Sequence, residues 1–445
     1  MIGLLSQVDI RTMPEGFGGA LTKDVANVHP LGLAAVLILG SIMLTVPRRW
    51  AFLTMFVMAC FVSSGQKVVV FSLDFNFLRL MVLFGVLRII YRREFQRFIW
   101  HPCDKVIVLW TICGTVIYTL QQGSISALIF KMGVSYDILG IYFVARCLIK
   151  EWVDLKCFLL GSIATGVIVM VFFGLEASTG RNIFSIFGGV PAITMVRQGR
   201  LRCQGAFPHP ITAGTFWAAM WPLFVTQWWD GHKGKIWAVT GTVTVWFIVF
   251  TCASSTPVMA LASGIVGGIM FVMRRYMRMV RWGIALTLIA LHLVMQAPVW
   301  HLISRVSAVD GSTGWYRYYL IDQAIKHFSE WAVIGTRSTA HWFWGAQDVT
   351  NQYILEGVRG GFLTLCVFVA LIAFSFKEAG YLWRAVSRDK EKRAMAWGLG
   401  VSLFVHCVIG IGGAYMGIGL LVLCFTFAAI TSMSAAEQAR RPVAG

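Results

Sequence analysis

Long apolar runs follow one another along almost the whole chain, and this succession constrains the fold more than any motif does. A helix that crosses a bilayer needs about 20 predominantly apolar residues, and its backbone polar groups must be satisfied within the helix. Hydrophobic residues make up 58% of the 445 residues and charged residues 13%, whereas soluble domains are about 25% charged. The sequence therefore predicts an all-α integral membrane protein, with one polytopic domain over residues 1–445.

Thirteen apolar runs are candidates for membrane spans, so we predict about 12–13 transmembrane helices whose ends are accurate to a few residues. The segment 50–66 is the least certain of them and is either a full span or a re-entrant segment. The candidate spans are 30–47, 50–66, 75–91, 104–120, 132–149, 155–175, 211–228, 235–252, 257–273, 281–298, 360–377, 394–411 and 413–431.

The basic residues between these spans indicate an orientation. Most of the lysines and arginines that give the chain its net charge of +18 lie on alternate connections, such as 274–281 and 377–393. Cytoplasmic loops of membrane proteins are enriched in lysine and arginine. We therefore expect these connections and the C-terminus in the cytoplasm. The N-terminus and two long polar loops, 176–210 and 299–357, are then external.

The first external loop combines arginines with an absence of carboxylates. No acidic residue occurs between Glu176 and Asp230. Guanidinium groups beside a membrane then need an anionic partner, such as lipid headgroups or a lipid-linked phosphate. We expect some of these side chains to bind a diphosphate or polyanion, with interaction at the headgroups as the alternative. The candidates are Arg197, Arg200 and Arg202.

His209, between two prolines at the end of this loop, either contacts substrate or shapes the turn. In the second loop, apolar residues at 315, 319, 320, 324, 325 and 328 recur at helical spacing. This pattern predicts a short helix lying at the membrane interface. Arg317 on that helix is a candidate site residue, and the alternative is a pair with Asp310 or Asp322.

The end of the second loop contains polar residues just before the next span. Asp348, Thr350 or Asn351 is expected to cap that span. The functional alternative is a polar pocket at the helix N-terminus that faces the first loop, with Asp348 and His341 as candidates for a general base. The sequence contains no Walker A motif, no His-Glu-x-x-His and no paired-carboxylate motif. We therefore expect no cofactor, no metal and no nucleic-acid partner.

Two groups of motifs resemble the O-antigen ligase and polymerase superfamily. The first is Arg-x-x-Gly-x-Phe-x-His-Pro, from Arg202 to Pro210, followed by small residues and a helix. The second is an ordered series of Arg317, a turn at Gly335, and Asn-x-Tyr with Glu-Gly-x-x-Gly-Gly over 351–361. Members of this superfamily are polytopic glycosyltransferases of the bacterial inner membrane. They take glycans from an undecaprenyl diphosphate carrier at its outer face, without nucleotide sugars.

The resemblance implies that the chain transfers or polymerises polyprenyl-diphosphate-linked glycan repeats in O-antigen or exopolysaccharide synthesis. Arg202 and Arg317 would contact the diphosphate, supported by Arg200, and Asn351 would bind substrate. A glycan or lipid acceptor, membrane lipids and polysaccharide assembly proteins would be its partners. Thr350 stands where family members often have a histidine, which leaves the general base open between Asp348 and His341. A lipid-linked glycan flippase or transporter and a non-catalytic assembly partner are the alternative functions.

Overall fold

The computed structural model describes residues 28–440, apart from 64, 71–72, 97 and 306–313. The expectation for the N-terminus lies outside the described residues. The described part is almost entirely helical, and each of the thirteen predicted runs overlaps one helix. These helices are α1 Pro30–Thr45, α2 Arg48–Phe61, α3 Phe77–Tyr91, α4 Pro102–Gln122, α5 Ile125–Leu148, α6 Trp152–Thr179, α7 Pro210–Val225, α8 Gly231–Thr251, α9 Ser255–Ile269, α10 Met277–Val294, α14 Gln352–Ala385, α15 Lys390–Gly412 and α16 Gly419–Arg440.

Eight helical segments of the described chain are long and apolar enough to cross a membrane. They are Pro102–Gln122, Ile125–Leu148, Trp152–Thr179, Gly231–Thr251, Arg274–Val294, Gln352–Ala385, Lys390–Gly412 and Gly419–Arg440. The helices α1 and α9 are apolar but shorter, with 16 and 15 residues. At 1.5 Å per residue they reach about 24 Å, somewhat less than the hydrocarbon core of a bilayer. The molecule is thus an all-α protein of the membrane type.

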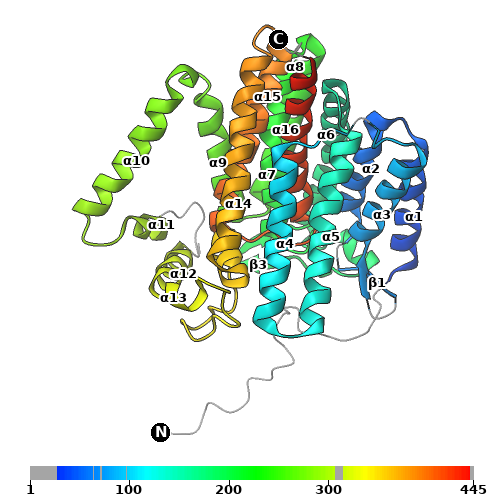
Figure 1. Ribbon diagram of the computed structural model, residues 1–445. Helices are drawn as coiled ribbons and strands as arrows, with labels where there is room; N and C mark the ends of the chain where they lie inside the picture. Colours follow the sequence, from blue (N-terminus) through cyan, green and yellow to red (C-terminus); the bar gives the residue numbers. More distant parts are fainter. Residues whose placement is uncertain (1–27, 64, 71–72, 97, 306–313, 441–445) are drawn as a thin grey trace.

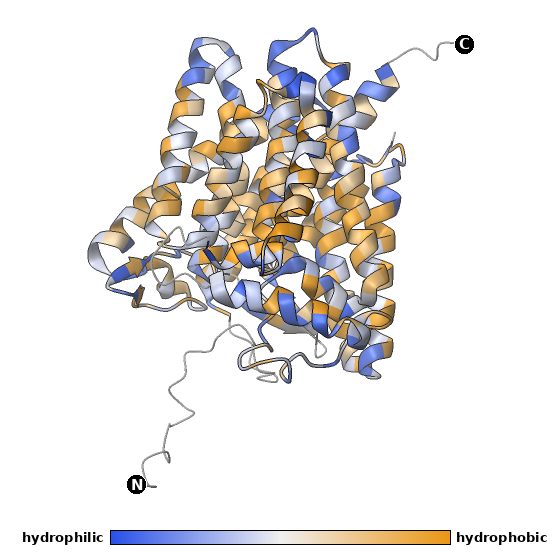
Figure 2. Cartoon of the chain, turned by 90° about the vertical axis from the view of Figure 1, so that its left-hand side faces the viewer, coloured by the Kyte–Doolittle hydropathy of each residue, from blue (hydrophilic) through white to orange (hydrophobic). Residues whose placement is uncertain are grey.

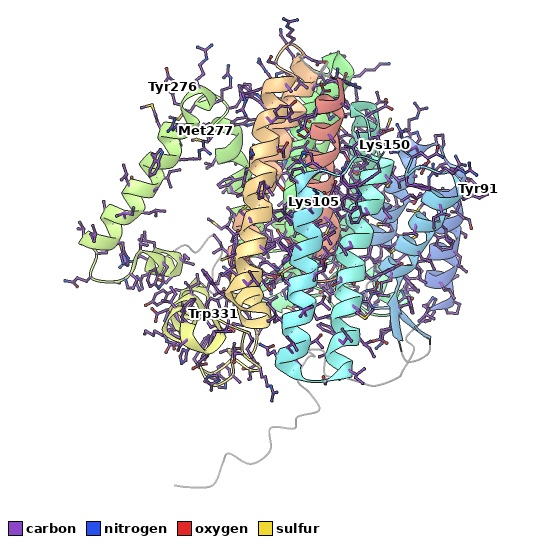
Figure 3. All side chains as sticks on the ribbon, in the orientation of Figure 1. Tyr91, Lys105, Lys150, Tyr276, Met277 and Trp331 are labelled. Atoms are coloured by element: carbon purple, nitrogen blue, oxygen red, sulfur yellow. The ribbon has the colours of Figure 1, made fainter. Side chains whose placement is uncertain are left out.

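The helices run side by side and alternate in direction, so that the connections fall at two ends of the bundle (Figure 1). One end carries residues 180–209, 295–305 and 314–351, together with the short connections 252–254 and 413–418. We call it the loop end, and we call the opposite end the basic end. Figure 3 shows Lys105 and Lys150 toward the basic end and Trp331 at the loop end. The two loops with the candidate site residues therefore share one end.

Apolar residues dominate the middle of the helices, and hydrophilic residues gather toward the two ends (Figure 2). One large core of buried side chains includes Phe56, Phe158 and Trp217, and the Phe56 ring packs edge to face with the other two. By contrast, α10 stands apart from the bundle (Figure 1), and none of its residues is buried. An apolar helix with no protein around it is expected to face lipid.

Two short hairpins were not predicted. The strands β1 (Lys67–Val70) and β2 (Leu73–Asn76) pair between α2 and α3, and β3 (Met195–Arg197) pairs with β4 (Arg200–Arg202) in the first loop. The helix α2 ends at Phe61 rather than at the predicted residue 66. The prediction for that end was wrong because Val62 is already extended and the chain then enters the turn that precedes β1.

The helix α14 is interrupted near its N-terminus. Gly361 has a φ of 68°, and a Cβ there would press on the carbonyl oxygen of Val333. Gly335, with a φ of 77°, lies against the carbonyl oxygen of Val358 in the same way, and the backbone N–H of Thr336 donates to that oxygen at 2.8 Å. The turn of the second loop therefore fits against the break in α14, and both contacts leave no room for a side chain.

Candidate functional site

The β3–β4 hairpin presents several arginines on one face. Its register pairs Arg197 with Arg200 and Met195 with Arg202. Since side chains alternate between the two faces of a strand, these four residues share a face. The turn consists of Gln198 and Gly199, both with positive φ, as in the tight turns that join antiparallel strands. Two arginines opposite each other repel, so this face is suited to an anion.

The hairpin is fastened to the bundle by a carboxylate that does not pair with an arginine. Glu176, near the end of α6, is buried, and its Oε1 accepts from the backbone N–H of Gln204 at 3.1 Å and from the Thr194 hydroxyl at 3.2 Å. Its Oε2 accepts from the backbone N–H of Gly205 at 2.9 Å. The carboxylate nearest in sequence to the arginines is therefore occupied in holding the backbone of the loop.

Arg202 is buried, with 4% of its surface exposed. One terminal nitrogen donates to the Ser254 hydroxyl at 3.4 Å, and the other lies 3.5 Å from the sulfur of Met195. Its buried Nε has no hydrogen-bond partner. No carboxylate of the described residues forms an ion pair with Arg202. A guanidinium has five N–H groups, so most of the donor capacity of Arg202 is unused.

Arg317 approaches the same region from the second loop. It lies on α12 (Gly314–Lys326), the short helix that was predicted, and a terminal nitrogen donates to the Thr256 hydroxyl at 2.7 Å. Its Nε is also buried without a partner. The alternative pair with Asp322 does not form, because Asp322 instead bonds Lys326 at 2.8 Å. Asp310 lies outside the described residues.

The two arginines thus reach hydroxyls that are two residues apart at the start of α9. Ser254 is the N-cap of α9, and its side chain makes no capping hydrogen bond. The free N–H groups at a helix N-terminus favour anions. Burial, followed by the charge of Arg197, lowers the pKa of both Arg202 and Arg317 from the ordinary arginine value. The charge of Arg197 therefore acts on both Arg202 and Arg317, and neither of these two forms an ion pair with a described carboxylate. We call Arg197, Arg202 and Arg317 the arginine cluster.

His209 adjoins the arginine cluster and also caps α7. Its Nδ1 accepts from the backbone N–H of Ile211 at 3.1 Å. Burial, together with the charges of Arg202 and Arg197, lowers the pKa of His209 to about 4. The ring is therefore neutral near pH 7, and its proton resides on Nε2 because Nδ1 is an acceptor. The structure accounts for the turn-shaping role of His209.

A cavity of about 310 Å³ lies next to this group of residues, and most of its lining is apolar. Pro208 and Thr212, which flank His209 along the chain, line one side of it. Ala414 lines another side and comes two residues after Gly412, whose carbonyl oxygen accepts from the Thr256 hydroxyl at 3.4 Å. The cavity therefore offers apolar surface beside the residues that flank His209, and none of the arginine cluster lines it.

Asp348 is placed near the start of α12. The Tyr316 hydroxyl lies 2.7 Å from the carbonyl oxygens of both Gly345 and Asp348 and donates to them. Burial raises the pKa of the Asp348 carboxyl above its usual value, which makes the carboxylate a stronger base. Because Tyr316 precedes Arg317 on α12, the backbone of Asp348 is attached to the helix that carries a cluster arginine.

His341 belongs to a different group of residues. Its Nε2 lies 2.8 Å from a carboxylate oxygen of Glu330, and its ring is near those of His327 and Trp342. None of its described contacts is to the arginine cluster. Arg200 is exposed at the tip of the hairpin, on the arginine face. The structure therefore separates His341 from the arginines with which the sequence had grouped it.

Asn351 is the N-cap of α14. Its Oδ1 accepts from the backbone N–H groups of Tyr353 at 3.0 Å and Ile354 at 3.1 Å, and its Nδ2 donates to the carbonyl oxygen of Ile411 at 3.1 Å. Capping was one of the two predicted roles for this stretch, and Asn351 fulfils it. The same residue ties the start of α14 to the end of α15.

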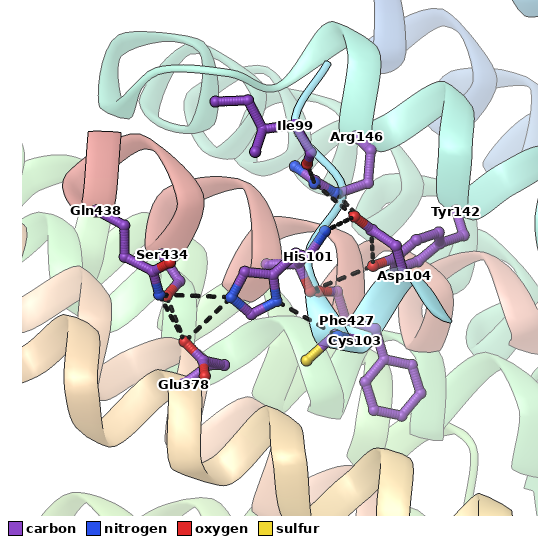
Figure 4. A network of polar contacts seen from close by, with 11 residues as sticks. Ile99, His101, Cys103, Asp104, Tyr142, Arg146, Glu378, Phe427, Ser434 and Gln438 are labelled. Carbon is purple, nitrogen blue, oxygen red and sulfur yellow. Dashed lines mark hydrogen bonds and ion pairs between the residues drawn. The ribbon is translucent and has the colours of Figure 1, made fainter. Parts of the chain in front are cut away.

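A second polar group lies toward the basic end and is shown in Figure 4. Arg146 pairs with Asp104 at 2.9 Å, and the Tyr142 hydroxyl donates to the same carboxylate at 2.6 Å. His101 caps α4 and lies 3.4 Å from Glu378. These charges have partners within the bundle, so we assign them to helix packing.

The sequence left two interpretations open for Asp137, which sits within an apolar run. It is either a functional intramembrane carboxylate or a member of a structural pair with Lys131 or Arg146, the basic residues that bracket it. It does form a structural pair, but the partner is Arg79, whose Nε and a terminal nitrogen lie 3.0 and 3.1 Å from the two carboxylate oxygens. The partner was wrong because α3 lies beside α5 in the bundle, whereas Arg146 faces Asp104. The pairing therefore gives Asp137 a structural role in the bundle.

The sequence had no signal for the hydroxyls of Ser254 and Thr256, which lie on a short connection remote in sequence from both loops. A comparison with protein-family models finds no match, and no curated protein matches the chain. The functional argument therefore depends on the residues themselves.

Proposed function

We propose that this protein transfers glycan from a polyprenyl diphosphate carrier to an acceptor hydroxyl, as in polymerisation or ligation of surface polysaccharide. The observation that carries the proposal is the arginine cluster. Two arginines from separate loops meet at the N-terminus of α9 with buried Nε atoms that lack partners. A diphosphate has several oxygens that can accept from such donors, and its charge would balance the cluster.

The geometry supports a simple division of tasks. In the transfer, the acceptor hydroxyl attacks the anomeric carbon, a new C–O bond forms, and the bond from that carbon to the diphosphate breaks. Negative charge grows on the departing diphosphate, where Arg202 and Arg317 would stabilise it more strongly than in the ground state. The apolar cavity beside His209 would accommodate part of the prenyl chain. Arginine charge would supply the stabilisation of the leaving group.

The acceptor proton must go to a base, and Asp348 is the better of the two candidates. Its backbone carbonyl oxygen accepts from Tyr316 on the helix of Arg317, and burial raises the pKa of its carboxyl. His341 instead contacts Glu330. We therefore assign the proton transfer to Asp348 and assign His209 a hydrogen bond to the substrate. The reaction would then take place at the loop end, which we propose is the outer face of a bacterial inner membrane.

The decisive experiment uses purified protein in nanodiscs with a polyprenyl-diphosphate-linked oligosaccharide. Release of free polyprenyl diphosphate and growth of the glycan are followed together. We expect R202A and R317A each to lower the rate about 10- to 100-fold, since a hydrogen bond to a charged group contributes about 1.5–3 kcal/mol. The matched control is R181A, which removes an exposed arginine of the same loop and should leave the rate unchanged.

The same assay separates the alternatives. Release with longer glycan indicates a polymerase, and release with transfer to a separate acceptor indicates a ligase. Binding of the lipid without release, together with transbilayer movement of the lipid in liposomes, would identify a flippase instead. Binding with neither release nor movement would identify a non-catalytic assembly partner. Full activity of both arginine variants would contradict the assignment of the site.

A further inference from the structure

A second cluster of side chains lies in the second loop, apart from the arginine cluster. His327, Glu330 and His341 each offer one ligand atom, and these atoms all lie within 4.8 Å of one another. We propose that they form a zinc-binding site. His327 follows α12, Glu330 is on α13 (Phe328–Trp331), and His341 is on the turn beyond. The site would therefore join two parts of the loop that are ten or more residues apart.

The spacing of the ligand atoms suits a zinc ion. Zinc binds histidine nitrogen and carboxylate oxygen at about 2.0–2.2 Å in tetrahedral geometry, so neighbouring ligand atoms are about 3.3 Å apart. The Nε2 of His341 is 2.8 Å from one oxygen of Glu330, and the Nε2 of His327 is 3.9 Å from the other. These two distances lie on either side of the required value. Small side-chain rotations would bring all three atoms to it.

The surroundings hold the ligands in the required state. The Nδ1 of His327 lies 2.9 Å from the carbonyl oxygen of Gln323. A carbonyl only accepts, so Nδ1 carries the proton and Nε2 presents its lone pair toward Glu330. Zinc-binding histidines commonly donate their other N–H in this way. The indole N–H of Trp342 donates to Glu330 at 3.1 Å, and the His327 ring stacks on the indole with centroids 5.3 Å apart.

The site is accessible to an ion from outside the protein. The side chains of His341 and Glu330 are 55% and 37% exposed, so the fourth position of the metal would be open to water. Directly beneath lies a small hydrophobic core that includes Trp331, Trp342 and Leu355. Bound zinc would therefore stabilise the packing of this small core and the position of the C-terminal end of α12. The inference concerns the stability of the loop and does not depend on the proposed transfer reaction.

The test measures zinc binding to the full-length protein in detergent, purified without a histidine tag. Isothermal titration with Zn²⁺ should give one site with micromolar or tighter affinity, and Co²⁺ should give the visible spectrum of a tetrahedral complex. The double variant H327N/H341N should weaken Zn²⁺ binding at least 100-fold. The matched control is H301N, which changes a histidine of the same loop whose ring packs edge to face with Tyr318 outside the cluster, and it should bind as the wild type does.

Two results would overturn the proposal. One is a wild-type protein that does not bind Zn²⁺ at micromolar concentration, and the other is a double variant that binds as tightly as the wild type. A misfolded double variant is recognised by its thermal unfolding, and the single variant H341N, at an exposed position, then provides the comparison. Its affinity for Zn²⁺ should fall at least tenfold, and an unchanged affinity would likewise contradict the site.

Discussion

At the scale of single residues, the structure contains two arginines that are costly without a ligand. A buried donor that lacks a partner costs about 1–3 kcal/mol, and both Arg202 and Arg317 have such an Nε. Burial, and after it the nearby charge of Arg197, lowers the pKa of both. A structure keeps such an arrangement where an anion relieves it. The choice of these two arginines was available from the sequence, whereas their meeting at Ser254 and Thr256 required the fold.

Replacing Arg202 or Arg317 with lysine provides a test of how the charge acts. R202K and R317K keep the positive charge but lose the planar fork of donors. We expect the rate of diphosphate release to fall about tenfold in each, less than for the alanine variants, with substrate binding retained. Steady-state kinetics with the lipid-linked substrate check this. Lysine variants as inactive as the alanine variants would show that the fork matters more than the charge.

The stability of the protein should depend on the protonation of His209. Its pKa in the folded protein is about 4, against an ordinary value of 6.5. Between these pH values the unfolded state binds more protons, so stability rises with pH. The contribution is fully present above about pH 6.5 and is lost as the pH falls toward 4. In H209N an amide oxygen can still cap α7 but does not titrate. Its melting temperature should therefore vary less with pH over this window, and parallel curves would contradict the prediction.

At the scale of helices and strands, the length of the apolar runs predicted the helices reliably, whereas the two short hairpins could not be predicted from the sequence. The thirteen predicted runs each overlap a helix because about 15 or more apolar residues leave little choice in a membrane. The strands of both hairpins have three or four residues, which is too short for an alternating pattern to stand out. The break at Gly361 was also missed in part. The predicted span began at residue 360, yet α14 starts at Gln352 on the near side of the break.

The contacts of this break predict which glycines cannot be replaced. In G335A and G361A the new Cβ would press on a backbone oxygen while the residue keeps a positive φ. We expect each variant to lower the free energy of unfolding by about 2 kcal/mol or more. Thermal unfolding in detergent measures this. G283A on α10 is the control, because nothing lies within 4 Å of its Cβ position, and it should be neutral or slightly stabilising.

At the scale of the whole molecule, the alternating helices bring both long loops, and the short connection with Ser254 and Thr256, to one end. The distribution of basic residues predicted this sharing of one side. The charge distribution does not predict which loop residues are in contact. Such contacts depend on how segments remote in sequence pack together, and the hydropathy of each apolar run does not determine this packing. The eight long apolar segments support passage through a membrane, and the direction of insertion remains a prediction.

Epitope insertions can establish this direction. The first insertion point is Gly199 at the tip of the hairpin, where nothing lies within 4 Å of the Cβ position. The second is the turn between Arg388 and Lys390 at the basic end. Antibody should label the first epitope on intact spheroplasts and the second only after the membrane is permeabilised. Labelling in the opposite order would place the arginine cluster in the cytoplasm and would exclude a reaction at the outer face.

The shortness of the β3–β4 hairpin has a consequence for the motions of the loop. Its two strands have only three residues each, and so short a pair should open often when no anion is bound. Inorganic diphosphate should close it, and amide hydrogens over 195–202 should then exchange with deuterium more slowly. Chloride at equal ionic strength should have a smaller effect. Deuterium exchange of the hairpin amides, measured by mass spectrometry, would thus report whether the anion is bound, without any catalytic turnover.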